Sequence, residues 1–115
     1  MAIYYDKEQC TITLDTQHTT YQMKIGPGGL LLHTYYGPTA EGDQSYLIPS
    51  RDRGFSGNPY DAGNQRAISA DTFPLEYPCE GNGDFRAPAF SLRRCNGAVG
   101  CDLRYQEHRI LPGKY

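Results

Sequence analysis

Apolar and polar residues alternate along the first third of the chain. The alternation runs through residues 11–14 and 21–25, which a polar stretch at residues 15–19 separates. A strand with one buried face has this two-residue period. The Gly-Pro-Gly-Gly run at residues 26–29 then breaks the pattern, and residues 30–36 follow, largely apolar or aromatic on both faces. We therefore expect three strands joined by turns, the third covered on both sides.

The middle of the chain carries too many Gly and Pro residues for regular structure. They interrupt the pattern from about Gly37 to Pro88, so no helix is expected in this segment. Compact domains rarely hold so long an irregular segment unless it has a function or packs against another part of the protein. Residues 71–78 contain two prolines, so they can be extended only at the edge of a sheet.

Alternation returns near the end of the chain, in residues 89–95 and 101–105. The Asn96-Gly97 pair between them is a strong hairpin signal. The sequence as a whole therefore predicts an all-β protein with a long irregular loop segment in its middle.

The composition indicates an ordered chain that is short of core. Only 20 of the 115 residues are Leu, Ile, Val or Phe, a share below the roughly 20% that folded domains normally exceed. The net charge of −2 and the ten tyrosines argue against disorder. The length allows one domain at most. We therefore expect an ordered but incomplete domain, and the end of the chain, without a polar tail, favours the same interpretation.

Charge and hydropathy exclude several partners. The sequence pI of 5.8, with acids and bases interspersed, gives no field that would attract nucleic acid or an anionic membrane. The longest apolar run, residues 30–32, is far too short to span a bilayer, and the polar first residues lack the apolar stretch of a signal peptide. We expect a cytoplasmic protein with no nucleic-acid and no membrane partner.

The residues that most often bind metals are poorly arranged for that purpose. Cys10, Cys79, Cys95 and Cys101 contain no Cys-x-x-Cys pair, and the three histidines lack a ligand at metal spacing. A disulfide between Cys95 and Cys101 across the hairpin is an alternative, but without a secretion signal we expect reduced thiols. Nucleotide-binding fingerprints are also missing. No metal and no cofactor are expected.

Asp52 is the carboxylate in the most suggestive surroundings. Arg51 and Arg53 flank it in a glycine-rich loop and would keep it ionised, and an ionised carboxylate accepts hydrogen bonds from two neighbouring sugar hydroxyls. Arg66 lies in a comparable context, where its donors could reach ligand oxygens. Ion pairs that merely stabilise the loop explain these residues equally well.

Five tyrosines have two possible uses. They could stack on sugar rings or pack in an interface, and because core residues are scarce we favour the interface. They are Tyr35, Tyr36, Tyr46, Tyr60 and Tyr77.

Several motifs resemble the amino-terminal domain of bacterial family 36 α-galactosidases. They are Arg-Asp-Arg-Gly-Phe-Ser-Gly-Asn-Pro-Tyr at residues 51–60, Asp-Thr-Phe-Pro-Leu-Glu-Tyr-Pro at 71–78 and Gly-Asp-Phe-Arg-Ala-Pro-Ala at 83–89. Residues 31–37 and 102–110 match the same pattern in order and spacing. The resemblance covers nearly the whole chain.

The resemblance implies a cytoplasmic retaining hydrolase that removes terminal α-linked galactose from melibiose, raffinose and related oligosaccharides without a metal. In this family a β-supersandwich precedes a (β/α)8 barrel, which supplies both catalytic aspartates. The amino-terminal domain contributes to tetramer assembly, and its loop places an Asp and an Arg near the sugar. By motif these positions are Asp52 and Arg66. Gln65 and Ala67 depart from the Asp and Thr that the family more often has beside this arginine.

Residues 1–115 are therefore expected to form a partial amino-terminal β-sandwich domain of an α-galactosidase, without the barrel and inactive alone. Its implied partners are a galactose-containing oligosaccharide, contacted by Asp52 and Arg66, and the rest of the enzyme or neighbouring subunits of a homo-oligomer. The alternatives are a self-standing β-sandwich module that binds carbohydrate or forms oligomers, and a truncated chain that does not fold alone.

Overall fold

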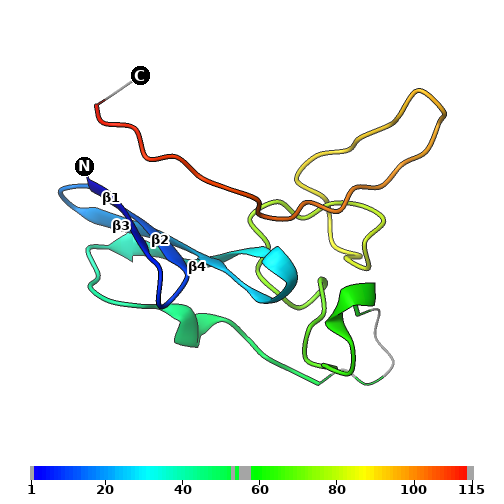
Figure 1. Cartoon of the computed structure of the whole chain (residues 1–115), viewed down its shortest axis with the longest axis horizontal. Helices are drawn as coiled ribbons and strands as arrows, with labels where there is room; N and C mark the ends of the chain where they lie inside the picture. The colour runs from blue at the N-terminus through cyan, green and yellow to red at the C-terminus, as the bar shows by residue number, and fades with distance from the viewer. Residues whose placement is uncertain (1, 53, 55–57, 114–115) are drawn as a thin grey trace.

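The first third of the chain forms an antiparallel sheet in the computed structural model, which describes residues 2–52, 54 and 58–113 (Figure 1). The strands lie side by side in chain order: β1 (Ala2–Asp6), β2 (Thr11–Asp15), β3 (Thr19–Ile25) and β4 (Leu31–Pro38). The all-β class is confirmed, and the sheet is consistent with a β-sandwich. The turn predicted between the last two strands also forms, as the 3₁₀ turn η1 (Pro27–Gly29), with Gly28 at a φ of 63°.

Strand β1 is the element that the sequence pattern did not predict. It is an edge strand that pairs along its length with β2, from Ala2 opposite Asp15 to Asp6 opposite Thr11. Its residues are exposed or half-buried in alternation, so no apolar stripe distinguishes it from a polar terminus.

One face of the sheet is polar and yet buried. Thr13, Thr20 and Gln22 are almost completely buried. The Gln22 amide donates to Thr13 Oγ1 at 3.0 Å and to the Gly42 carbonyl at 3.0 Å, and its oxygen accepts from the Gln44 backbone N–H at 2.8 Å. The segment after β4 therefore covers this face and satisfies its polar groups, as burial requires.

The opposite face carries apolar residues of the alternation and is only partly covered. Tyr21, Met23 and Ile25 are half-buried, although a half-buried strand normally hides its apolar side. The last part of the chain lies over the β1 end of this face, where the His108 ring is 4.6 Å from the Tyr5 ring. Ile12 on this face is buried, so the chain itself covers part of the sheet's apolar side.

The segment after β4 is irregular, as predicted from about Gly37 to Pro88. Among the described residues after Pro38, the only helical elements are the 3₁₀ turns η2 (Ser45–Leu47) and η3 (Tyr60–Ala62). The density of Gly and Pro, which prevents a regular ladder or helix, is the physical reason.

The irregular segment pairs with the free edge of β4. His33 donates its backbone N–H to the Pro74 carbonyl at 2.7 Å, and the Glu76 N–H donates to the Leu31 carbonyl at 3.0 Å. This contact confirms that residues 71–78 run at a sheet edge, the position that tolerates their prolines.

A small core forms where the sheet meets the irregular segment. Leu30 and Leu32 are buried against Ile68 and Phe73, and Leu75 packs beside them. The apolar residues of β4 therefore fold against side chains that lie about forty positions later in the chain.

The hairpin predicted over residues 89–105 forms only at its tip. The Arg94 N–H donates to the Ala98 carbonyl at 2.9 Å, and Gly97 adopts a φ of 83°, so the turn is correct. The prediction of two flanking strands is wrong, because the backbones of these residues pair with other parts of the chain. Ala89 donates to the Pro78 carbonyl, and Cys101 donates to the Glu80 carbonyl.

The four cysteines are free, as predicted. Cys79 is buried and its thiol donates to the Tyr77 carbonyl at 3.0 Å. Burial, together with the Cys101 thiol nearby, raises the pKa of Cys79, which keeps it protonated at neutral pH.

We expect Leu32→Ala to lower the free energy of unfolding by about 3 kcal/mol, because Leu32 is 1% exposed and its loss leaves a cavity in a small core. Leu47→Ala is the matched control, since Leu47 is 48% exposed, and we expect it to cost less than about 0.5 kcal/mol. Urea unfolding followed by circular dichroism measures both. Equal costs for the two variants would contradict the placement of the core.

Candidate functional site

Asp52 and Arg66 lie together in the irregular segment. Arg66 Nε is 3.1 Å from Asp52 Oδ1, and the same oxygen accepts the Gly54 backbone N–H at 2.8 Å. The side chains remain 58% and 60% exposed, respectively. The two residues that the sequence singled out independently are therefore partners, and hydrogen-bonding atoms of both still face solvent.

A cation from a separate turn lies beside Asp52. Among the described residues Arg66 is at ion-pair distance, while Arg53, one of the two arginines that flank Asp52 in sequence, lies outside the described residues. Gly54 has a φ of 67°, and a Cβ at this position would lie 3.3 Å from Arg66 Nη2. Glycine thus allows the backbone turn and the close approach of the guanidinium.

Arg66 projects from a turn that is anchored at its far end. The Ile68 N–H donates to the Gln65 carbonyl at 3.2 Å, which closes the turn, and the Asn58 amide donates to the same carbonyl at 3.3 Å. Ile68 belongs to the buried core. An exposed charged residue is therefore held close to a fixed point of the fold.

The pair has the chemistry of a polar ligand contact. A carboxylate accepts hydrogen bonds, and a guanidinium offers several donors in a fixed plane, so together they match adjacent hydroxyl groups, which both donate and accept. An ion pair this exposed stabilises a fold by only about 0 to 1 kcal/mol. Stability alone gives little reason for its presence.

A second carboxylate and arginine, Asp84 and Arg86, are arranged differently. The Asp84 side chain is fully buried, and Arg86 donates to it through Nε at 2.9 Å and Nη2 at 2.9 Å. Arg86 Nη2 also donates to the carbonyls of Ala70 at 2.8 Å and Phe73 at 2.7 Å. Burial would raise the pKa of Asp84, but the hydrogen bonds and charge of Arg86 outweigh it and lower that pKa.

Sequence reasoning missed a third polar cluster, which joins β3, β4 and the irregular segment. Glu76 accepts from the Tyr21 hydroxyl at 2.5 Å and lies 3.1 Å from His33 Nδ1. Burial and the Glu76 carboxylate raise the pKa of Tyr21, so the phenol stays protonated and donates. The three residues are far apart in sequence, and no local signal indicates their contact.

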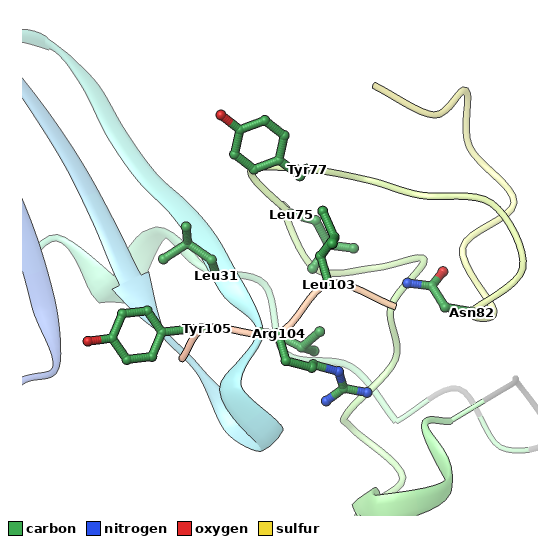
Figure 2. A pocket seen from close by; sticks show the side chains of 8 residues that line it. Leu31, Leu75, Tyr77, Asn82, Leu103, Arg104 and Tyr105 are labelled. Atoms are coloured by element: carbon green, nitrogen blue, oxygen red, sulfur yellow. The ribbon is translucent and has the colours of Figure 1, made fainter. Parts of the chain in front are cut away.

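A cavity of about 230 Å³ lies between β4 and the last part of the chain (Figure 2). Leucine and tyrosine side chains make up much of its wall. Its cation, Arg104, is already bound by Asp102 at 2.8 Å and by the Gly28 carbonyl at 2.8 Å. The cavity thus offers little polar chemistry, and Asp52 and Arg66 do not line it.

Residues 2–52, 54 and 58–113 place no three His, Cys, Asp or Glu side chains together in a way that could hold a metal ion. No helix in the described part of the chain has the length and apolar character needed to cross a bilayer.

Comparison with known proteins gives consistent matches. The model of the glycosyl hydrolase family 36 N-terminal domain matches residues 29–115. The bifunctional alpha-galactosidase/sucrose kinase AgaSK of Mediterraneibacter gnavus is 45% identical over 115 residues, which are all of this chain and 12% of that protein. Alpha-galactosidase AgaA of Geobacillus stearothermophilus is 37% identical, over 99% of this chain and 16% of that protein.

Solved structures match in the same way. The galactosidase domain of AgaSK superposes with a TM-score of 0.92 at 45% identity, covering 99% of this chain and 16% of that one. A variant of Geobacillus stearothermophilus AgaA in complex with raffinose superposes with a TM-score of 0.79 at 39% identity, covering 91% of this chain and 14% of that one. The chain therefore spans less than a fifth of the length of these relatives.

We expect the stability that Asp84 contributes to depend on pH. Its pKa is lower in the folded chain than in the unfolded chain, where it is about 3.9. The contribution is therefore fully present above that pH and is lost as the pH falls through the lower, folded pKa. Asp84→Asn should cost about 2 kcal/mol at pH 7, and less as the pH falls below about 3.9.

Urea unfolding of both proteins at steps from pH 7 to below about 3.9 measures the difference. Glu107→Gln, at a side chain 71% exposed, is the control and should show no such convergence. A cost of Asp84→Asn that stays constant with pH would contradict the assignment.

Proposed function

Because the chain belongs to the glycosyl hydrolase family 36 N-terminal domain family, we propose that it is the amino-terminal, substrate-contacting portion of an α-galactosidase. The enzyme would hydrolyse terminal α-linked galactose in oligosaccharides of the melibiose and raffinose type. Relatives named alpha-galactosidases, one of them solved with raffinose, support the substrate class. The bond would be cleaved by parts of the enzyme outside these 115 residues, so the chain is proposed to be inactive alone.

Asp52 and Arg66 are the proposed sugar contacts. The observation that carries this proposal is their pairing at 3.1 Å while both side chains stay more than half exposed. Such a pair can accept a hydrogen bond from one hydroxyl of a galactosyl unit and donate to its neighbour. The contact gains strength when the rest of an active site excludes water, because the local dielectric then falls.

The proposal includes assembly with other protein surfaces and a cytoplasmic location. Exposed aromatic side chains support the first, and so does the partly covered apolar face of the sheet; the aromatic side chains include Tyr36, Tyr46, Tyr60 and Tyr77. The free cysteines are in keeping with a reducing compartment, and cell fractionation tests the location.

A chimeric enzyme tests the sugar contact. In it, this chain replaces the segment of the AgaSK galactosidase domain that it matches. We expect Asp52→Ala to raise the KM for raffinose about 10- to 100-fold, the effect of losing a hydrogen bond to a charged group.

Glu107→Ala is the matched control for this experiment, because Glu107 is also an exposed carboxylate paired with an arginine. An unchanged KM in the Asp52→Ala chimera, equal to that of the control, would remove the basis for the proposed contact. Sedimentation of the unmutated chimera tests assembly, and it should give the oligomeric state of the parent enzyme.

For the isolated 115-residue chain we expect no turnover of an aryl α-galactoside and no heat of binding with galactose or raffinose. Binding that Asp52→Ala abolishes would instead support a self-standing carbohydrate-binding module. Turnover that depends on a carboxylate of this chain would contradict the proposal outright.

A further inference from the structure

The Gly-Asp-Phe-Arg-Ala-Pro-Ala motif contains a guanidinium that is bound on two sides. On one side Arg86 donates hydrogen bonds to the fully buried carboxylate of Asp84 through two nitrogens, at 2.9 Å each. On the other, Arg86 Nη2 donates to the carbonyls of Ala70 and Phe73 at 2.8 and 2.7 Å. The motif therefore clamps a backbone segment that lies more than ten residues away in sequence.

The clamped segment is a tight turn. The backbone N–H groups of Thr72 and Phe73 both donate to the Ser69 carbonyl at 3.2 Å, and the Thr72 hydroxyl donates to the same oxygen at 3.1 Å. Ser69, Ala70 and Phe73 are buried. Two carbonyls of this turn are directed to a single arginine, which fixes its orientation as well as its position.

The turn leads directly back to Arg66. Ile68 precedes Ser69 and packs with Phe73 in the core. Its N–H closes the turn from Gln65 that presents Arg66 to Asp52. A displacement of the clamped turn would therefore move Ile68 and, with it, the guanidinium of Arg66.

We propose that Asp84 and Arg86 are positioning residues for the galactoside contact, which hold the turn at residues 69–73 so that Arg66 meets Asp52 in a fixed geometry. This inference rests on the proposed function of the pair. It assigns a role to the motif at residues 83–89, which otherwise has no connection to the site.

The role requires arginine. Four acceptor contacts use the three N–H groups on the Nε and Nη2 atoms of one planar group, two to the carboxylate and two to the carbonyls, so one N–H is shared between two acceptors. A lysine offers a single nitrogen that cannot reach both sides in this plane, so Arg86→Lys should keep the charge and lose the clamp.

Steady-state kinetics of the AgaSK chimera with raffinose provide the first test. We expect Arg86→Lys to raise KM about tenfold with little change in kcat, as misplacement of a binding group does. Because the effect passes through Arg66, adding Arg86→Lys to Arg66→Ala should change KM less than about twofold further. Asp84→Asn is the second variant if Arg86→Lys does not fold, and Arg109→Lys, at a side chain 79% exposed, is the control.

Hydrogen exchange of the Ile68 amide in the same chimera provides the second test. We expect Arg86→Lys to speed this exchange about tenfold or more, and Arg109→Lys to leave it unchanged. A lower melting temperature with unchanged KM and exchange would overturn the inference, since that is the effect of a merely structural arginine. Fully additive effects of Arg86→Lys and Arg66→Ala on KM would overturn it as well.

The two proposals can fail separately. If Arg66→Ala and Asp52→Ala leave KM unchanged, the sugar contact is wrong. The positioning of the turn is then decided by exchange alone, with faster exchange in Arg86→Lys supporting it and equal exchange overturning it.

Discussion

The packing of the irregular segment against β4 is the contact on which the rest of the structure depends. Leu30 and Leu32 supply the sheet's side of the small core, and Ile68 and Phe73 supply the other side. Backbone hydrogen bonds beside Leu75 add to the packing by joining the segment to the free edge of β4. This contact attaches a long segment with almost no regular structure to the sheet.

The sheet buries its polar face more completely than its apolar face. Thr13, Thr20 and Gln22 are buried beneath the segment that follows β4, and each has hydrogen-bond partners. On the other face Tyr21, Met23 and Ile25 are half-buried. This arrangement accounts for the low content of Leu, Ile, Val and Phe, because a polar network takes the place of part of the core.

The features predictable from sequence are those with a local cause. The strands β2 and β3 follow from alternation, β4 follows from a run that is apolar or aromatic on both faces, and the turns at Gly28 and Gly97 follow from glycine. The flanks of the last hairpin were wrong, because alternation cannot show that Cys101 pairs with Glu80 instead. Motif comparison found Asp52 and Arg66, but their contact depends on long-range packing that no local pattern encodes.

The irregular segment contains two Asp–Arg pairs that differ in burial and in what the arginine binds. Asp84 is buried and its arginine binds backbone, whereas Asp52 and Arg66 are exposed and bind each other. The exposed pair is the proposed sugar contact. The most direct measurement is a crystal structure of the AgaSK chimera with 1-deoxygalactonojirimycin, a compound bound in one solved relative. We expect an Asp52 carboxylate oxygen within about 3.2 Å of a ligand hydroxyl. A bound ligand that touches no atom of residues 1–115 would contradict it.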